Sequence, residues 1–369
     1  MKNVIRVLVV DDSSTMRQIL ISMLQDAPGF EVVGQAQDGL EAVQLAAALR
    51  PDVIMMDIRM PRMNGLEATR CIMSATPTPI VVVSNNVYEA DLNIAFNAIA
   101  AGALTVVEKP RGLDSDSYLA VADQLVTAVR LMADVQVVAL LPSVPAWPTQ
   151  PASLAGPALK PAASIEVIAI AASTGGPGVL NQILSNLPAD LSFPIVIVQH
   201  ITTGFGNGMA HWLDSLTPLK VAIAQDGEIL TPGRVLIAPD DAHLVVAPGG
   251  LVQIDRSAPV NGSRPSGTRL FQSVAQVYGA AALGIILTGM GDDGVEGLGA
   301  LRKAGGHVIA QSENSCAVFG MPKVAIERNL VDEVLSPDGI VAALKRRSEA
   351  NKRARWAGPP TAQSIRTGG

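Results

Sequence analysis

The sequence predicts two α/β domains, each built on a mostly parallel β-sheet with helices between the strands. Three observations support this. The chain of 369 residues exceeds the size at which a single hydrophobic core keeps growing. Short runs rich in β-branched residues alternate with stretches of helical periodicity in both halves of the chain. Between the two series, residues 141–163 hold six prolines among alanine and serine, a composition typical of a linker.

These patterns divide the chain into four parts. We expect one domain over residues 1–133, a linker rich in proline and alanine over 134–163, a second domain over 164–347 and a basic, flexible tail over 348–369. Lysines and arginines between positions 345 and 355 are interpreted as a solvated helix end that leads into this tail.

In the first half, we expect five strands, over residues 6–10, 31–36, 53–56, 80–83 and 103–107. Apolar residues at helical spacing follow the first of them behind Ser13 and Ser14, which are common helix caps. In the second half, we expect strands over residues 165–171, 195–199, 235–238, 243–246, 284–288 and 307–310.

Composition excludes several classes of protein. Apolar residues make up 49% of the chain, but no segment approaches the ~18 consecutive apolar residues that span a bilayer, so we expect no membrane insertion. The net charge of −6 argues against a nucleic-acid partner, because phosphate binding needs a basic surface. Cys71 and Cys316 form neither a disulfide framework nor a zinc spacing, which fits a reducing cytoplasm.

Polar residues stand at the ends of the expected strands in the first half. Asp11 and Asp12 end the first strand, Asp57 the third, Ser84 the fourth and Lys109 the fifth. Taken singly, the aspartates could cap a helix and the lysine could pair with an acid. Because the carboxyl ends of parallel strands form one edge of an open sheet, where ligands bind, we expect all five side chains to converge there.

Such a cluster favours a metal and phosphoryl chemistry. Neighbouring carboxylates repel one another unless a hard cation neutralises them, and their oxygen atoms suit Mg²⁺. The metal would orient a phosphoryl group for in-line attack by one carboxylate.

With these features, residues 4–130 resemble the receiver domain of two-component response regulators, which has a flavodoxin-like (βα)5 fold. The matching segments are Val-Val-Asp-Asp-Ser at 9–13, Met-Asp-Ile-Arg-Met-Pro at 56–61, Asn-Gly at 64–65, Ser84 and Glu-Lys-Pro at 108–110. One position departs from the pattern: many receivers place an aromatic residue three positions before the lysine, where this chain has Val106.

The resemblance implies a role for each polar residue. Asp57 would accept the phosphoryl group. Mg²⁺ would be ligated by Asp12, Asp57 and the carbonyl of Arg59, with Asp11 assisting. Ser84 and Lys109 would hold the phosphoryl oxygens, the lysine as a point charge and the serine as a hydroxyl donor.

In the second half, the expected strand 165–171 leads into Ala-Ser-Thr-Gly-Gly-Pro at 172–177. Ser173 thus occupies a strand-to-helix turn, where a hydroxyl is exposed near helix N–H groups that tolerate negative charge. The turn is not the Gly-x-Ser-x-Gly elbow. A dinucleotide-binding turn beginning at Gly176 is disfavoured, because the third glycine position is Asn181 and Asp190 precedes the next strand instead of ending it.

A serine nucleophile needs a base, and the chain has four histidines. His211 lies in an amphipathic stretch. His243 and His307 begin strands, which would place them at the opposite edge of the sheet from Ser173. His200 directly follows a strand and is therefore expected at the same edge as Ser173.

The glycine-rich turn at 289–294 contributes two carboxylates, Asp292 and Asp293, to that edge. By spacing alone, either could hold the histidine in the right tautomer. A calcium loop is disfavoured, because its oxygen-ligand spacing is absent. The glycines also free N–H groups for an oxyanion site.

Residues 165 to about 345 closely resemble the catalytic domain of the chemotaxis protein-glutamate methylesterases, the CheB family. Six blocks agree in order: residues 172–177, 198–200, 237–239, 259–265, 288–294 and 319–322. The resemblance implies a doubly wound, mostly parallel fold. It also implies Ser173 as nucleophile, His200 as base, Asp293 as the orienting acid and the backbone N–H of Met290 as an oxyanion donor, with no cofactor for hydrolysis.

Three segments depart from the family pattern. Ile201-Thr202 replaces the usual Met-Pro after the histidine, residues 206–209 replace a phenylalanine-rich stretch, and Ser263 replaces a common histidine.

The two resemblances together imply a cytoplasmic methylesterase that removes methyl groups from glutamate 5-O-methyl esters of chemoreceptors, releases methanol, and deamidates receptor glutamines. A histidine kinase of the CheA type would phosphorylate Asp57. We hypothesise that the unphosphorylated receiver covers the Ser173 cleft. Two alternatives stay open: a methylesterase of a chemosensory pathway unrelated to motility, and a non-enzymatic response regulator with a relic triad.

Overall fold

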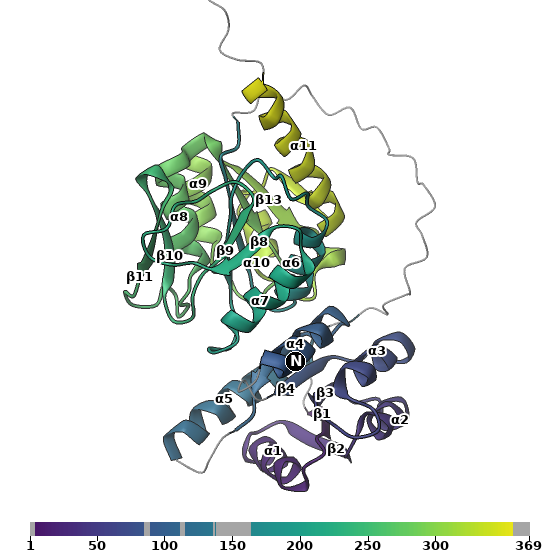
Figure 1. Cartoon of the computed structure of the whole chain (residues 1–369). Helices are drawn as coiled ribbons and strands as arrows, with labels where there is room; N and C mark the ends of the chain where they lie inside the picture. Colours follow the sequence, from purple (N-terminus) through teal and green to yellow (C-terminus); the bar gives the residue numbers. More distant parts are fainter. Residues whose placement is uncertain (1–3, 85–88, 111–114, 136, 138–163, 357–369) are drawn as a thin grey trace, which may run out of the picture.

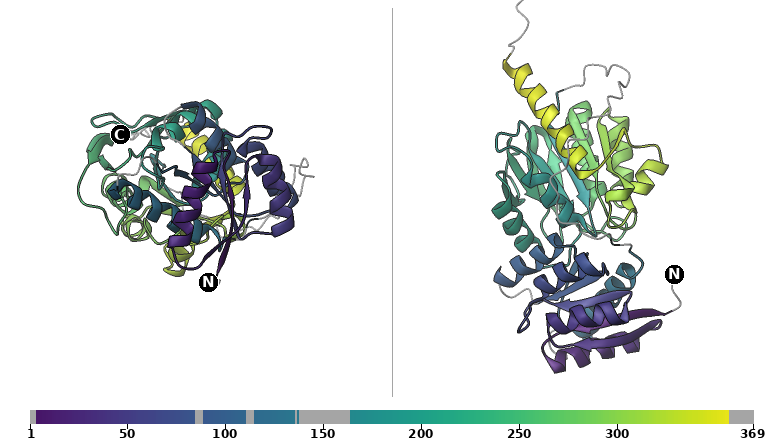
Figure 2. Two further views of the ribbon diagram at one scale, coloured as in Figure 1. Left: turned by 90° about the horizontal axis from the view of Figure 1, so that it is seen from below. Right: turned by 90° about the vertical axis from the view of Figure 1, so that its right-hand side faces the viewer.

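In the computed structural model, residues 4–84, 89–110, 115–135, 137 and 164–356 are described. They form two α/β domains, one on each side of an extensive contact (Figures 1 and 2). The predicted linker falls largely on residues 138–163, outside the described residues. None of the helices in the described ranges is long and apolar enough to cross a membrane.

The first domain has the five-stranded parallel sheet that the sequence predicted, and its strand order is β2-β1-β3-β4-β5. Its elements are β1 (Ile5–Val10), α1 (Ser14–Asp26), β2 (Phe30–Ala36), α2 (Gly39–Leu49), β3 (Val53–Asp57), α3 (Gly65–Ala75), β4 (Ile80–Ser84), α4 (Glu89–Ala100), β5 (Thr105–Glu108) and α5 (Ser115–Met132).

Local signals in the sequence account for these elements. Strands β3 and β4 are buried along their whole length, which explains their continuous apolar runs. Ser13 caps α1 by accepting from the Met16 N–H. Asn64 and Glu67 form a capping box at the start of α3, immediately after the loop that follows Asp57.

The second domain is a seven-stranded parallel sheet in the order β14-β13-β12-β6-β7-β9-β8, beside the antiparallel pair β10-β11. Its elements are β6 (Val167–Ala172), α6 (Gly176–Ser185), β7 (Ile195–Gln199), α7 (Gly206–Leu216), β8 (Lys220–Ile223), β9 (Arg234–Ile237), β10 (His243–Ala247), β11 (Leu251–Asp255), α8 (Gly267–Tyr278), β12 (Ala282–Ile286), α9 (Val295–Lys303), β13 (His307–Gln311), α10 (Met321–Glu327), β14 (Glu333–Leu335) and α11 (Pro337–Trp356), with short 3₁₀ turns at 248–250, 279–281 and 313–315.

Helices cover both faces of this sheet. One buried cluster joins the strands to α6, α7 and α11, and another joins them to α8, α9 and α10. The middle strands β7, β6 and β12 are buried throughout, so the turns that follow them meet at one edge near the centre of the sheet. The predicted α/β fold class is confirmed for both domains.

The strands of the second domain differ from the sequence prediction in two respects. Residues 243–246 form a strand, but β10 pairs with β11 through a local turn and not with the parallel sheet. The inference that His243 lies at the far edge of that sheet was therefore wrong. Strands β8, β11 and β14 were not predicted, because they are short and partly exposed and so lack a continuous apolar run.

The expected tail boundary at residue 348 also differs from the structure, since α11 continues to Trp356. Ser348 and Asn351 are buried, and they hydrogen-bond to the N–H of Ser192 and the carbonyl of Ile165. Through these hydrogen bonds, Ser348 and Asn351 hold the C-terminal part of α11, which carries the basic residues, against the second domain.

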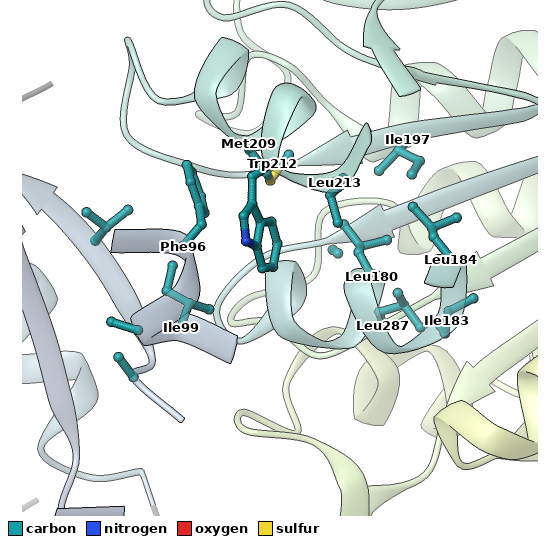
Figure 3. Close-up of a cluster of buried hydrophobic side chains, with 14 of the residues drawn as sticks. Phe96, Ile99, Leu180, Ile183, Leu184, Ile197, Met209, Trp212, Leu213 and Leu287 are labelled. Carbon is teal, nitrogen blue, oxygen red and sulfur yellow. The ribbon is translucent and has the colours of Figure 1, made fainter. Parts of the chain in front are cut away.

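Helix α4 of the first domain packs against α6 and α7 of the second. The ring of Phe96 stacks on that of Trp212, with centroids 5.5 Å apart and planes at 25°. Nε1 of Trp212 donates to Oδ1 of Asn97 at 3.0 Å. Figure 3 shows Phe96 and Ile99 facing Trp212 and its neighbours, so that one apolar cluster runs through both domains.

Candidate active site and phosphorylation site

Ser173 lies in the turn between β6 and α6, at the carboxyl edge of the sheet. Its N–H donates to the carbonyl of Thr288 at 3.0 Å, and its carbonyl accepts from the N–H of Gly176 at 2.8 Å. The turn is thereby tied both to the β12 segment and to the first turn of α6. Ser173 is partly exposed at this edge of the sheet.

His200 follows β7 directly and lies beside this turn. Its N–H donates to the carbonyl of Ala172 at 2.9 Å, which ties His200 to the residue before Ser173. Ser173 and His200 line the same small cavity, of about 30 Å³. On its other side, the His200 ring reaches Asp293, with Nε2 2.9 Å from Oδ2.

Asp293 is held at the N-terminus of α8. Besides His200, its carboxylate accepts from the Ser266 hydroxyl at 2.7 Å and from the N–H groups of Gly267 at 2.6 Å and Thr268 at 3.2 Å. Burial alone would raise the pKa of Asp293, but the hydrogen bond and charge of His200, together with these donors, lower it to about 2. The carboxylate is therefore ionised at neutral pH.

The choice that spacing left open between Asp292 and Asp293 has a geometric answer. Asp293 contacts His200, whereas the carboxylate of Asp292 faces the Arg328 guanidinium, 3.8 Å away. Of the two, Asp293 is therefore the one in contact with His200, and its orienting role remains the prediction from the resemblance.

Gly289 brings the glycine-rich turn against Ser173. A Cβ at this position would lie 2.6 Å from the Cβ of Ser173 and 2.5 Å from the sulfur of Met321, so only glycine allows this approach. Met290, the next residue, is 49% exposed and also lines a cavity of about 770 Å³ between α5 and residues 313–319. Its backbone N–H remains the predicted oxyanion donor.

The other histidines lie elsewhere. His211 is exposed on α7. His243 is buried, with Nε2 3.2 Å from the carbonyl of Ala258. His307 pairs with Glu333 at 2.8 Å, at the opposite edge of the sheet.

In the first domain, the predicted phosphorylation site forms a compact acidic cluster. Carboxylate oxygens of Asp11, Asp12 and Asp57 lie within 4.8 Å of one another. Nζ of Lys109 lies 2.8 Å from Asp57 and 2.7 Å from Asp11. Ser84 is buried at the end of β4, and its carbonyl accepts from the Lys109 N–H at 3.0 Å.

The electrostatics of this cluster suit a bound divalent cation. Burial raises the pKa of Asp57; Lys109 opposes this and Asp11 adds to it, so that the pKa rises to about 6. Burial disfavours the Lys109 charge, yet Asp57 and Asp11 outweigh it and raise the lysine pKa. The cluster has three carboxylates and one ammonium group, so it keeps an excess of negative charge, and its carboxylate oxygens are ligands that suit Mg²⁺. Arg59, the predicted carbonyl ligand, follows β3 in an exposed loop.

The first domain covers the Ser173 cavity. Ile99, Leu104, Thr105 and Val106 line it together with Ser173 and His200. The Leu104 carbonyl accepts from the Gly175 N–H at 3.3 Å. The Val106 carbonyl accepts from the Thr202 hydroxyl at 3.1 Å.

Comparison with known proteins assigns both halves. The CheB methylesterase model matches residues 168–344, and the response regulator receiver domain model matches residues 7–115. The chain is 48% identical over 335 residues to protein-glutamate methylesterase/protein-glutamine glutaminase 4 of Myxococcus xanthus, covering 90% of this chain and 94% of that relative. It is 50% identical over 341 residues to protein-glutamate methylesterase/protein-glutamine glutaminase 3 of Anaeromyxobacter dehalogenans, covering 92% and 98%. The chain belongs to the CheB family.

Among solved structures, the Thermotoga maritima CheB methylesterase catalytic domain is 41% identical, with a TM-score of 0.48, and the match covers 50% of this chain and 99% of that domain. The family predicted from the sequence is confirmed, and so is the presence of a receiver domain in the same chain. The roles of the individual site residues remain predictions.

Three polar residues of this CheB-family site were not found from the sequence. Gln199 contacts the carbonyls of both Ser173 and His200, and Ser266 contacts Asp293. The Thr288 hydroxyl donates to the carbonyl of Thr174 at 3.0 Å. Gln199 ends β7 and Thr288 follows β12 by two residues, so their place near strand ends was the available signal. Glutamine and threonine do not by themselves indicate a catalytic role.

Proposed function

We propose that this chain is a phosphorylation-activated protein-glutamate methylesterase and protein-glutamine glutaminase, acting on chemoreceptors. One observation carries the proposal. The His200–Asp293 pair is formed, with Nε2 2.9 Å from Oδ2, and His200 shares its cavity with Ser173. A domain that only bound a partner would need neither a buried, ionised carboxylate on the histidine nor a hydroxyl beside it.

The pair determines which nitrogen acts as base. Since Nε2–H donates to Asp293, Nδ1 keeps the lone pair that accepts the Ser173 proton. Ser173 Oγ then attacks the carbonyl carbon of the glutamate ester, and the imidazolium is stabilised by the Asp293 carboxylate. The developing oxyanion is stabilised by the N–H of Met290.

Collapse of this intermediate breaks the bond to the leaving group. His200 returns its proton to the departing oxygen, which leaves as methanol, and Ser173 carries a glutamyl ester. Water, deprotonated by His200, then attacks that ester and releases the glutamate side chain and the free serine. With a glutamine substrate, the same steps expel ammonia.

The acidic cluster would serve the switch. Asp12 and Asp57, with Asp11 and the carbonyl of Arg59, would hold Mg²⁺, which supplies charge neutralisation for phosphoryl transfer. An Asp57 carboxylate oxygen would attack the phosphorus of a phosphodonor such as the phosphohistidine of a CheA-type kinase; the bond from phosphorus to the histidine nitrogen breaks, the histidine leaves, and Asp57 carries an acyl phosphate. Lys109 and Ser84 would then hold the phosphoryl oxygens.

Regulation follows from the position of β5. Lys109 comes directly after this strand, and the residues of and before β5 cover the Ser173 cavity. When Asp57 is phosphorylated, Lys109 gains phosphoryl oxygens as partners. We infer that β5 and the residue before it then shift, which weakens the contacts of Val106 with Thr202 and of Leu104 with Gly175. Access to Ser173 then increases.

The test is methanol release from a methylated chemoreceptor fragment. Wild type should release methanol faster after phosphorylation by acetyl phosphate, and Ser173→Ala should release none above background in either state. Equal release from wild type and Ser173→Ala would eliminate the hydrolase proposal and favour a non-enzymatic response regulator.

A further inference from the structure

The side chain of Gln199 lies between the turns that carry the nucleophile and the base. Gln199 is the last residue of β7 and is 4% exposed. Its Nε2 donates to the carbonyl of Ser173 and to the carbonyl of His200, both at 2.8 Å. One buried nitrogen therefore bridges the two backbones on which catalysis depends.

The surroundings fix the orientation of this amide. An amide oxygen cannot face two carbonyl oxygens, so the nitrogen occupies this position and both of its hydrogens are used. The amide oxygen lies against Gly176, where a Cβ would come within 2.1 Å of it. Glycine at 176 is thus required for the bridge, and the two residues form a matched pair.

The bridge sets the direction of the peptide between Ser173 and Thr174. The Ser173 carbonyl is held by two donors, the N–H of Gly176 and Nε2 of Gln199. In a trans peptide the N–H points opposite to the carbonyl, so the Thr174 N–H is directed away from Gln199. The conformation of the nucleophile turn therefore depends on this amide.

The same nitrogen also restrains the base. The His200 N–H is tied to the carbonyl of Ala172 at 2.9 Å, and the His200 carbonyl is tied to Gln199. The His200 N–H is therefore tied to the end of β6, and its carbonyl to the same nitrogen that holds the Ser173 carbonyl. A change at Gln199 moves nucleophile and base relative to each other, and not merely one of them.

We propose that Gln199 is a positioning residue of the hydrolase, which sets the mutual orientation of Ser173 and His200 without touching the substrate. The proposal rests on the serine-hydrolase function and deepens it. A misplacement of about 1 Å in a catalytic group costs on the order of 10²-fold in rate. Loss of the bridge should therefore lower kcat and leave KM nearly unchanged.

Two variants of the full-length chain, phosphorylated by acetyl phosphate, separate positioning from packing. Gln199→Met keeps the size of the side chain but donates no hydrogen bond. Gln199→Glu keeps the shape, but its ionised form turns oxygen toward two carbonyls and regains a donor only when protonated. With a methylated chemoreceptor fragment as substrate, we expect kcat to fall roughly 10- to 100-fold in both, with KM within about twofold of wild type.

The pH profile is the decisive measurement. As the pH is lowered, the deficit of Gln199→Glu relative to wild type should shrink, because a protonated carboxyl can donate, while the deficit of Gln199→Met should stay constant. Asn351→Leu is the matched control: it removes another buried amide that donates to a backbone carbonyl, that of Ile165 at the other end of the Ser173 strand. It should lower Tm but not kcat.

Wild-type kcat in Gln199→Met, or an equal loss of kcat in Asn351→Leu, overturns the proposal. So does a deficit in Gln199→Glu that is independent of pH. Ser173→Ala distinguishes this failure from that of the underlying function. If Ser173→Ala is inactive while Gln199→Met is fully active, the hydrolase stands and only the positioning role is lost.

Discussion

Replacing Asn97 by alanine should activate the unphosphorylated enzyme. Asn97 lies on α4, and its Oδ1 accepts from Nε1 of Trp212 across the domain contact, at 3.0 Å. Trp212 is 1% exposed, so the alanine variant leaves a buried indole N–H without this partner in the docked state. In the undocked state, water can satisfy that N–H. The penalty, about 1–2 kcal/mol, therefore falls on the docked state alone.

A penalty of this size shifts an equilibrium by a factor of roughly 5 to 30. If docking restrains the unphosphorylated enzyme, Asn97→Ala should release methanol about 5- to 30-fold faster than wild type, up to the rate of the phosphorylated wild type. The phosphorylated variant should match the phosphorylated wild type. Asn186→Ala is the control, because the Asn186 amide donates to the carbonyl of Gln182 within the catalytic domain.

The result that refutes the reasoning is a specific one. A stable Asn97→Ala protein whose unphosphorylated rate equals that of wild type would mean that the contact with Trp212 does not hold the enzyme closed. A rate increase of the same size in the phosphorylated state would place the effect in the catalytic domain instead of the docking step.

Four further predictions concern the interface, the triad, the metal and stability. Thr202→Val removes the hydroxyl that donates to the Val106 carbonyl and should raise the unphosphorylated rate several-fold; an unchanged ratio of phosphorylated to unphosphorylated rate would contradict this. Asp293→Asn should lower kcat by about 10⁴-fold, since the amide favours the wrong His200 tautomer, and retention of more than a tenth of wild-type kcat would remove Asp293 from the triad. Removal of Mg²⁺ with EDTA should abolish activation by acetyl phosphate and leave basal methanol release intact; loss of the basal rate would place a metal in hydrolysis. The hydrogen bond from His307 outweighs the effect of burial and, together with Arg347, lowers the pKa of Glu333 to about 2. The ionised Glu333 side chain therefore stabilises the folded state at pH values above its pKa in the unfolded chain. This stabilisation is lost as the pH falls toward 2. Glu333→Gln should cost about 1 kcal/mol at pH 7 and progressively less below pH 4, as measured by urea unfolding, and a cost that does not depend on pH would argue against it.

The sequence predicted where the sites lie because strand ends are visible in it. A buried parallel strand is a continuous apolar run, and the polar residue that interrupts the run marks the carboxyl edge of the sheet. Asp57, Ser173 and His200 were located in this way, and the structure places each of them at the end of its strand or in the turn that follows. The same reasoning failed at His243, because a run of strand residues does not reveal which strand it pairs with.

The sequence did not predict contacts between residues that lie far apart in the chain and meet only in the folded protein. Asp292 and Asp293 are adjacent in the chain, and the choice between them depends on how the N-terminus of α8 meets the turn. Ser266 and Gln199 hold the site through hydrogen bonds to groups 27 and 26 residues away. Serine and glutamine are common at helix caps and strand ends in proteins that have no active site there, so their presence alone did not predict these contacts.

Two of the departures from the family pattern lie in contact with each other in the structure. Val106 stands where many receivers carry an aromatic residue, and Thr202 stands where the family has proline after the base. In the structure the Thr202 hydroxyl donates to the Val106 carbonyl, and proline at 202 could make no such bond. Val106 is 1% exposed and lines the cavity of Ser173 and His200.

In the sequence alone, Val106 concerns how the receiver transmits its signal, whereas Thr202 concerns how the substrate fits next to His200. Their contact shows that both belong to the surface through which the receiver covers the active site. Val106 precedes Lys109 by three residues along β5, so the predicted phosphoryl-contacting lysine and this surface lie on one short segment. We infer that a change at Lys109 would reach the His200 side through β5 and the Thr202–Val106 hydrogen bond, which is why Thr202→Val tests the coupling.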